Sequence, residues 1–340
     1  MHVLVTGGAG FVGSHLVDAL VRAEHRVTVL DNFDAFYERA IKERNIAQHR
    51  QNHRWRLLEA DVRDREAMRR GLTGRYDSIV HLAAKAGVRP SIDDPGAYQD
   101  VNVTGTLNLL ELARERGIRQ FIFASSSSVY GMNPRVPWSE HDDVLRPISP
   151  YASTKVSAEL LGHTYSHLHG IRFLALRLFT VYGPRQRPDL AVHKFTRLML
   201  AGQPVPILGA GRSMRDYTFV EDVVAGILRA IEYTATMFEI INLGNNRAVS
   251  LQDVIRELEA ACGVSATIDP QPEQPGDVPR TWANIEKATR LLGYAPRTTF
   301  SVGVRRFVEW YTAQPARAFE EASALRGSSA AATSHTPIHA

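Results

Sequence analysis

The stretch Gly7-Gly8-Ala9-Gly10-Phe11-Val12-Gly13 decides the fold. It follows the short apolar run Val3–Thr6 and opens the amphipathic segment Phe11–Glu24, which predicts a strand, a tight turn and a helix. The glycines at its first, fourth and seventh positions permit a tight turn, close approach of the backbone to a pyrophosphate, and close packing of helix on strand. The helix N-terminus then presents free N–H groups to the anion. We therefore predict a dinucleotide-binding turn.

An acidic residue in the right place strengthens this prediction. Asp31 ends the second predicted strand, 18 residues after Gly13. A carboxylate at this distance accepts hydrogen bonds from the adenosine ribose hydroxyls and repels a 2′-phosphate. The sequence therefore favours NAD over NADP as the cofactor.

Strand and helix patterns alternate through the first half of the chain. Short β-branched or apolar runs predict strands at Val3–Thr6, Arg26–Leu30, Trp55–Glu59, Ser78–Leu82, Gln120–Ala124 and Arg172–Leu178. Amphipathic segments predict helices at Phe11–Glu24, Tyr37–Arg50, Asp64–Arg70, Ala97–Arg116 and Ala152–His169. Such alternation indicates an α/β protein with a Rossmann-type doubly wound parallel sheet.

The pattern of strand and helix segments changes after Gly183-Pro184, where prolines and glycines divide the chain into shorter segments. We expect a smaller C-terminal α/β domain for the substrate, interleaved with the first domain. The expected ranges are 1–180 for the NAD-binding domain, with 238–248 returning to it, 181–237 and 249–313 for the substrate domain, and 314–340 for a disordered tail rich in Ala, Ser and His.

Composition sets limits on the protein class. The 340 residues are 44% hydrophobic and 22% charged, the proportions of an ordinary globular chain, and no apolar run approaches the roughly 20 residues of a membrane span. One cysteine and no secretory leader pattern favour the cytoplasm. A net charge of +4 without a basic helix or an aromatic-basic motif gives no support for nucleic-acid binding.

Tyr151 and Lys155 are the candidate catalytic pair. Their spacing in Tyr151-Ala152-Ser153-Thr154-Lys155 places a phenol and an ammonium on one helix face, one turn apart. A nearby ammonium favours the phenolate and lowers a tyrosine pKa, so the pair predicts a general base that works near neutral pH. The serine-rich run Ala124–Gly131 ends a predicted central strand, where open α/β sheets bind their ligands.

At these residues the chain resembles an extended short-chain dehydrogenase/reductase of the nucleotide-sugar epimerase group, from Met1 to about Tyr311. The resemblance implies that Ser126 hydrogen-bonds the sugar 4-hydroxyl, and that Tyr151 and Lys155 exchange its proton and bind the nicotinamide ribose. The cofactor-binding residues expected from the motif and the resemblance are Gly7, Gly10, Phe11, Val12, Gly13, Asp31, Asn32, Asp61, Val62, Leu82, Ala83, Ala84, Asn102, Tyr151 and Lys155.

Within that group, three segments resemble UDP-glucuronate 4-epimerases: His81–Arg89, Arg177–Asp189 and Gln274–Ala283. Thr180 stands where UDP-glucose 4-epimerases usually carry Asn, and with Arg187 it matches the glucuronate pattern. The resemblance implies a C4 epimerisation through a 4-keto intermediate. That intermediate is a β-keto acid, and we expect Thr180 and Arg187 to hold its carboxylate against decarboxylation, with Arg187 gripping it bidentately.

Neighbouring activities stay open as alternatives. Sugar 4,6-dehydratases carry Asp-Glu where this chain has Ser127 and Ser128, and UDP-glucuronate decarboxylases usually carry Glu at the second position. A serine cannot supply that carboxylate chemistry. UDP-glucose 4-epimerase and UDP-glucuronate decarboxylase remain the nearer alternatives. A non-catalytic NAD-binding regulatory protein is the distant one, since such relatives typically lose the Tyr/Lys pair.

The remaining substrate contacts rest on the resemblance alone. The full set of expected substrate-binding residues is Arg89, Ser126, Ser127, Ser128, Thr180, Arg187, Phe195, Arg215 and Arg280. Arg215 and Arg280 are expected at the diphosphate, and Phe195 at the uridine. A metal site is not expected, because His163 and His167 lack the glutamate of a metalloprotease helix. The resemblance also implies a homodimer, in which the long helices Ala97–Arg116 and Ala152–His169 form a four-helix interface.

Overall fold

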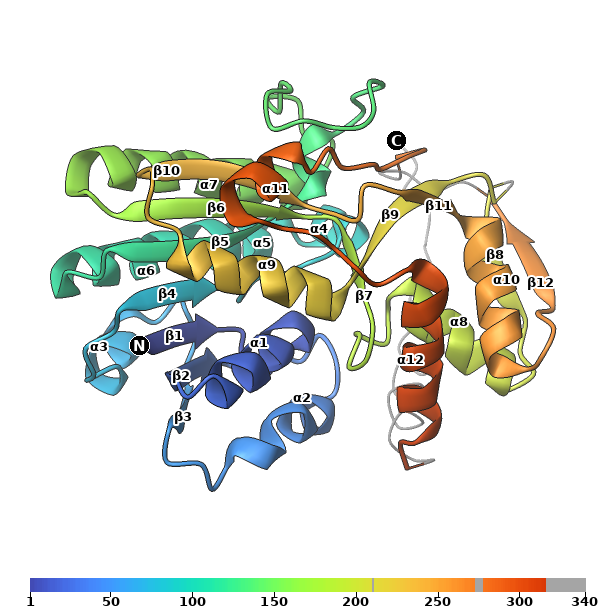
Figure 1. The fold of residues 1–340 in the computed structure, drawn as a ribbon, viewed down its shortest axis with the longest axis horizontal. Helices are drawn as coiled ribbons and strands as arrows, with labels where there is room; N and C mark the ends of the chain where they lie inside the picture. The colour runs from blue at the N-terminus through green and yellow to red at the C-terminus, as the bar shows by residue number, and fades with distance from the viewer. Residues whose placement is uncertain (210, 273–277, 316–340) are drawn as a thin grey trace, which may run out of the picture.

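The computed structural model describes residues 1–209, 211–272 and 278–315, so most of the predicted tail lies outside the described residues. Its centre is a seven-stranded parallel sheet in the order β10-β6-β5-β4-β1-β2-β3 (Figure 1). The strands are β1 (His2–Thr6), β2 (Arg26–Asp31), β3 (Trp55–Glu59), β4 (Ser78–His81), β5 (Gln120–Ser126), β6 (Arg172–Leu178) and β10 (Phe238–Leu243). All six predicted strands are confirmed, and so is the return of Phe238–Leu243 to this sheet.

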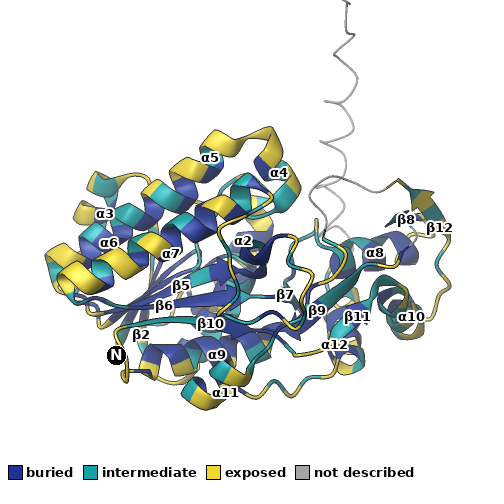
Figure 2. Ribbon diagram, turned by 90° about the horizontal axis from the view of Figure 1, so that it is seen from above, coloured by how far each residue is buried: buried dark blue, intermediate teal, exposed yellow. Residues whose placement is uncertain are grey.

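The sheet is buried on both faces, which explains why its strands read as continuous apolar runs. In β1 the side chains of Val3 and Val5 pack into one core and Leu4 into the other. Figure 2 shows the resulting three layers, with helices above and below the sheet. One layer contains α1 (Phe11–Arg22), α9 (Val220–Glu232) and α11 (Glu286–Leu292), and the other contains α3 (Arg65–Gly71), α6 (Gly105–Arg116) and α7 (Pro150–His169).

Two predicted helices are shorter or more divided than expected. Tyr37–Arg50 forms α2 (Arg39–Ile46) followed by a 3₁₀ turn. Ala97–Arg116 is not one helix: α5 (Pro95–Gln99) passes through a π-helical stretch, Asp100–Thr104, into α6. Single π turns inside α-helices occur frequently at functional sites, and Asn102 lies in this one.

The smaller part of the molecule lies beyond the carboxyl edge of the large sheet (Figure 1). It contains a three-stranded sheet of β7 (Thr180–Tyr182), β9 (Met214–Phe219) and β11 (Ala248–Ser250), and a two-stranded sheet of β8 (Val205–Leu208) and β12 (Ile268–Gln271). The helices α8 (Ala191–Leu200), α10 (Leu251–Cys262) and α12 (Phe300–Thr312) pack around a core of their own.

The interleaving of the two parts goes further than the expected ranges 181–237 and 249–313. Helices α9 and α11 fall inside those ranges, yet they pack on the large sheet in the same core as Val3 and Val5. The reason is their apolar face: Val220, Val223 and Ile227 on α9 are fully buried there. Within the described residues, no helix is both long and apolar enough to cross a membrane.

Candidate active site

The glycine-rich turn is a cradle that side chains would fill. Gly7 has a left-handed φ of +69°, and a Cβ there would lie 2.7 Å from the backbone N of Ala83. A Cβ on Gly13 would lie 2.1 Å from the carbonyl oxygen of Gly7. Since backbone atoms cannot yield as a flexible side chain can, only glycine fits either position. The turn leads directly into α1, so the predicted strand–turn–helix context is confirmed.

A cavity of about 510 Å³ opens at the carboxyl ends of the central strands, over the glycine turn. Its wall brings together residues far apart in the sequence. The predicted residues that line it are Gly7, Gly10, Phe11, Val12, Gly13, Asp31, Asn32, Val62, Leu82, Ala83, Ala84, Ser126, Ser127, Ser128, Tyr151, Lys155, Thr180 and Arg187. The shape and the free N–H groups of α1 suit a dinucleotide, with the serine and tyrosine side chains at its other end.

Asp31 is buried at the end of β2, and it also holds the loops around it. Its carboxylate accepts hydrogen bonds from the backbone N–H of Ala9 at 3.0 Å and of Phe33 at 2.9 Å. Burial raises the pKa of Asp31, while these hydrogen bonds and the Lys42 ammonium act in the opposite direction. Because each carboxylate oxygen has a second lone pair, Asp31 can still accept from a ribose hydroxyl.

The candidate catalytic pair lies on the first two turns of α7. The Ser149 side chain caps this helix by accepting from Ala152 N, and Pro150 occupies its first position, so its start is well defined. Lys155 is 3% exposed; its Nζ donates to the carbonyl of Ala124 at 2.8 Å and lies 5.8 Å from the ring centre of Tyr151. The two side chains therefore share one face of the helix, as predicted.

The pKa values of this pair depart from the expectation. Burial raises the pKa of Tyr151, and only the hydrogen bond with Ser126 and the charge of Arg187 oppose it. Burial also lowers the pKa of Lys155 to about 7, although Glu159 acts to raise it. The predicted lowering of the phenol pKa is therefore wrong for the protein without its cofactor, because burial of the phenol outweighs the influences that oppose it.

A buried ion pair, which the sequence did not predict, joins β6 to α7, the helix that carries the catalytic pair. Arg177 on β6 donates two hydrogen bonds to Glu159 on α7, Nε–Oε1 at 3.0 Å and Nη2–Oε2 at 2.8 Å. The Ser125 hydroxyl also donates to Glu159, at 2.5 Å. These bonds fix α7 against the ends of β5 and β6. Arg177 and Glu159 lie 18 residues apart in the sequence, and nothing in their spacing predicts that they pair.

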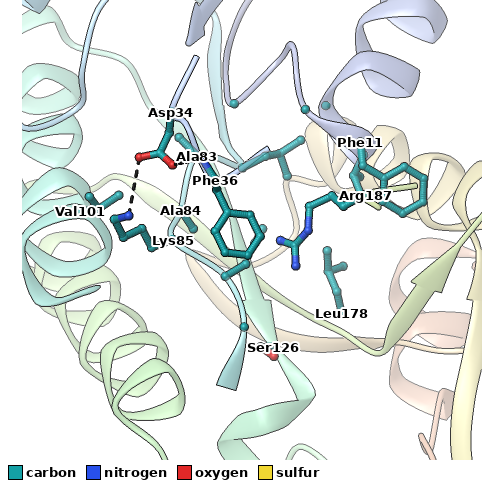
Figure 3. A pocket seen from close by; sticks show the side chains of 18 of the residues that line it. Phe11, Asp34, Phe36, Ala83, Ala84, Lys85, Val101, Ser126, Leu178 and Arg187 are labelled. Carbon is teal, nitrogen blue, oxygen red and sulfur yellow. Dashed lines mark hydrogen bonds and ion pairs between the residues drawn. The ribbon is translucent and has the colours of Figure 1, made fainter. Parts of the chain in front are cut away.

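Arg187 reaches the cavity from the loop after β7. Its guanidinium donates to Asp189 through Nε at 3.0 Å and Nη2 at 2.9 Å, and it lies 5.1 Å from the ring centre of Phe36. Figure 3 shows it between Phe36 and the wall formed by Leu178, with Ser126 below. Burial acts to lower the pKa of Arg187, but Asp189 raises it, so the group stays cationic.

Two predicted cofactor contacts, Asp61 and Asn102, are not on the cavity wall as the structure describes it. The Asp61 carboxylate is occupied by Arg63 and by the Asn32 amide, and hydrogen bonds from Arg63 lower the pKa of Asp61 to about 2. Asn102 bonds both the N–H and the C=O of Lys85, and it donates to Thr154. It therefore holds the loop after β4 in place.

Four predicted substrate contacts also lie off this wall. Phe195 is buried in the core around α8, where apolar packing accounts for it. Arg89 follows Val88, which does line the cavity, on the short helix α4 (Val88–Asp93). Arg215 and Arg280 are neighbours, because β9 forms a bridge between Met214 and Arg280. Their roles at a diphosphate remain predictions, and part of the third family segment, residues 274–277, lies outside the described residues.

The loop after β2 and the helix α2 contribute wall residues that the sequence did not predict: Asp34, Phe36 and Tyr37 lie on the loop, and Lys42 lies on α2. Lys42 is 6% exposed and donates to the carbonyl of Asp34 at 2.6 Å. The Asp34 carboxylate forms an ion pair with Lys85 at 3.6 Å across the cavity mouth (Figure 3). Only the position of Lys42 on a helix facing Asp31 could have indicated its role. In the described part of the chain no cluster of three or more His, Cys, Asp or Glu could hold a metal.

Comparison with known proteins identifies a family for the chain. A family model described as GDP-mannose 4,6 dehydratase matches residues 4–307. A probable UDP-glucuronate 4-epimerase of Rhizobium meliloti is 37% identical, over 92% of this chain and 97% of the relative. The crystal structure of a UDP-glucuronic acid 4-epimerase from Bacillus cereus, with UDP-glucuronic acid and NAD, is 36% identical with a TM-score of 0.85, over 92% of this chain and 99% of that one.

A UDP-glucose 4-epimerase of Thermotoga maritima, solved with UDP-glucose, is 33% identical with a TM-score of 0.84, over 92% of this chain and 99% of that one. The residues that the family model matches include the glycine turn and the Tyr151–Lys155 pair, and each of these relatives covers about nine-tenths of this chain. The chain belongs to the extended short-chain dehydrogenase/reductase family of nucleotide-sugar epimerases and dehydratases.

Proposed function

We propose that this protein is an NAD-dependent UDP-glucuronate 4-epimerase, which interconverts UDP-glucuronate and UDP-galacturonate. One observation carries the proposal: the Arg187 guanidinium lines the same cavity as Tyr151 and Ser126, close enough to influence the pKa of the phenol. A cation beside the catalytic phenol suits a sugar whose carboxylate is attached to C5, the carbon next to the reacting C4. The relatives named as UDP-glucuronate 4-epimerases support it.

The residues present fit NAD. The cradle of Gly7, Gly10 and Gly13 and the N-terminus of α1 would hold the pyrophosphate, and Asp31 the adenosine ribose. When bound, NAD supplies an acceptor that takes the hydrogen of C4 with its electron pair and later returns it. Lys155 would bind the nicotinamide ribose, and its buried position beside the cavity supports that role.

Tyr151 moves the proton in this mechanism. As phenolate it takes the proton of the C4 hydroxyl, and it returns a proton to the C4 oxygen after the 4-keto sugar has presented its other face. Ser126, already hydrogen-bonded to Tyr151, orients that hydroxyl and stabilises the developing charge. The chain by itself raises the pKa of Tyr151, and the positive charges of Lys155 and of bound NAD would act to lower it.

The substrate carboxylate must also be held in place. A 4-keto uronic acid loses CO₂ when the bond between C5 and the carboxylate carbon is perpendicular to the plane of the ketone. Thr180 and Arg187 would hold the carboxylate away from that orientation. Arg215 and Arg280 would bind the diphosphate from the adjoining strand. Dehydration and enzyme-assisted decarboxylation lack support, because Ser127 and Ser128 line the cavity where those enzymes carry carboxylates. UDP-glucose remains the second candidate substrate.

We further propose a cytoplasmic homodimer that pairs the outer faces of α6 and α7. Leu160 and Leu168 on α7 are 59% and 64% exposed, so this helix presents apolar side chains to solvent. Burial of this face against a second copy would remove both from water. Sedimentation of the purified protein tests this directly, and a single species of one-chain mass would contradict it.

The activity is tested by incubating the purified protein with UDP-glucuronate and UDP-glucose in separate reactions without added NAD, and identifying the products by NMR. The proposal predicts UDP-galacturonate from the first and little product from the second. Arg187→Ala should weaken binding of UDP-glucuronate and release UDP-pentose. Conversion of UDP-glucose alone would refute the substrate assignment, and no conversion of either would refute the epimerase assignment.

A further inference from the structure

We propose that Asp189 is a positioning residue, which orients Arg187 so that one edge of its guanidinium receives the substrate carboxylate. This inference rests on the proposed function. It assigns a task to a residue that neither the motif nor the cavity wall singles out, since Asp189 points at Arg187 and does not line the cavity.

The geometry of the ion pair defines which edge is used. Asp189 accepts from Nε and Nη2 of Arg187, at 3.0 and 2.9 Å, in a bidentate arrangement. A guanidinium has five N–H donors in a planar fork, and a second bidentate edge is formed by Nη1 with Nη2. A carboxylate can therefore bind Arg187 end-on without displacing Asp189.

The local backbone keeps the two side chains together. The N–H of Leu190 donates to the carbonyl of Arg187 at 3.2 Å, which closes a turn with Pro188 and Asp189 at its centre. Proline at the first central position fixes φ and stiffens such a turn. The turn leads directly into α8, whose first residue is Ala191. Asp189 is thus held by rigid backbone beside the arginine that it orients.

The plane of the guanidinium is fixed from another direction. Phe36, from the loop after β2, lies 5.1 Å from it and covers one face (Figure 3). Asp189 fixes rotation within the plane and Phe36 restricts tilting out of it, so Arg187 is held in one orientation before substrate binds. Preorganised donors of this kind give tighter binding and stricter geometry than donors that must be ordered on binding.

The effect of Asp189→Asn on the affinity for UDP-glucuronate distinguishes a positioning role from competition with the substrate. If Asp189 merely competed with the substrate for Arg187, then Asp189→Asn would strengthen binding of UDP-glucuronate. If Asp189 positions Arg187, the same change weakens binding and loosens the carboxylate. A loosely held carboxylate at the 4-keto stage can break its bond to C5. CO₂ then leaves, the electron pair passes into the C4 carbonyl, and the enolate takes a proton at C5, so a UDP-4-keto-pentose forms and the cofactor stays reduced.

The experiment compares the wild-type holoenzyme with Asp189→Asn, Asp189→Glu and the control Glu232→Gln, which removes an exposed carboxylate paired with Arg229 outside the site. We expect Asp189→Asn to raise KM for UDP-glucuronate about tenfold with kcat changed less than threefold. It should also raise the share of UDP-4-keto-pentose several-fold, seen by NMR and as reduced cofactor by absorbance. Asp189→Glu should recover part of both losses, and Glu232→Gln should match the wild type.

Binding separates this inference from the proposed function. The affinity of each holoenzyme for UDP-glucuronate and UDP-glucose is measured by calorimetry, and the inference predicts that Asp189→Asn weakens only the first. An unchanged or higher affinity for UDP-glucuronate, or an equal loss for both sugars, would overturn it. A wild type that turns over only UDP-glucose would refute the proposed function, whereas the affinity ratio would still decide whether Asp189 orients Arg187.

Discussion

Two loops meet at the cavity, and they are built in opposite ways. The shape of the turn from Gly7 to Gly13 depends on its backbone. Gly7 has a left-handed φ of +69°, and a Cβ on Gly7 or Gly13 would collide with backbone atoms. The shape of the loop of residues 183–189 depends on contacts made by side chains. It places Arg185 at a left-handed φ of +63°, where glycine would be easier, and relies on contacts to hold that shape.

Those contacts come mostly from outside the second loop. Asp18 on α1 pairs with Arg185 at 2.8 Å, and His15, also on α1, bonds the carbonyl of Pro184. Asp189 then holds Arg187. A backbone-defined site can be recognised from its own seven residues, whereas a site defined by side chains depends on partners elsewhere in the chain. The comparison predicts different losses when each loop is damaged.

The largest effect is expected from Gly13→Ala, which breaks the first loop. The new Cβ would lie 2.1 Å from the Gly7 carbonyl oxygen, so the turn must open, at a cost of about 3 kcal/mol or more in stability. Purified protein should contain almost no NAD and show no activity. The control is Gly202→Ala, at φ +64° with nothing near its Cβ; it should cost about 1 kcal/mol and keep its NAD. A Gly13→Ala variant with full NAD content would contradict the backbone account.

Tyr151→Phe removes the chemistry and leaves both loops intact. We expect kcat to fall about 10³-fold while the affinity for UDP-glucuronate and the NAD content stay within a few-fold of the wild type. Steady-state kinetics and calorimetry measure the two quantities. A kcat within tenfold of the wild type would remove Tyr151 from its assigned role.

Asp18→Asn weakens the contact between α1 and the loop of residues 183–189. Asp18 accepts hydrogen bonds from Gln48 and His49 as well as from Arg185, so the change should cost about 2 kcal/mol at neutral pH and raise KM several-fold. Burial acts to raise the pKa of Asp18, but the bonds from His49 and Arg185 outweigh it, and the folded pKa is lowered.

The pH dependence of that loss follows from the lowered pKa. A carboxylate with a depressed pKa stabilises the fold above its unfolded pKa of about 4, and this contribution is lost as the pH falls through the folded pKa. Denaturation of wild type and Asp18→Asn should therefore differ by a constant amount between about pH 6 and 8 and converge below about pH 4. A difference that grows toward low pH would contradict the assignment.

The smallest effect is expected from Lys85→Gln. The ion pair with Asp34 spans the cavity mouth at 3.6 Å with both side chains partly exposed, so its contribution is below about 1 kcal/mol. Exchange of bound NAD with labelled NAD should accelerate less than fivefold, and Asp34→Asn should do the same. If only Lys85→Gln has a large effect, the lysine binds the cofactor directly.

The features that could be predicted from the sequence are the local ones, as in the comparison of the two loops. The glycine turn, Asp31 at the end of its strand, and the four-residue spacing of Tyr151 and Lys155 are local patterns, and the structure places them together. The pairing of Arg177 with Glu159, the π-helical stretch around Asn102 and the lowered pKa of Lys155 depend on packing between distant segments. The place of α9 depends on such packing too: it falls within the range expected for the second domain, yet its apolar face packs on the large sheet.

The central claim is that a single carbon of the sugar loses its hydrogen to the bound cofactor and regains the same hydrogen on the other face. UDP-glucuronate carrying deuterium at C4 tests this most directly, with the product examined by NMR and mass spectrometry. The account predicts UDP-galacturonate with the deuterium retained at C4 and none incorporated from deuterated solvent into unlabelled substrate. Loss of the label to solvent, with inversion still complete, would contradict it.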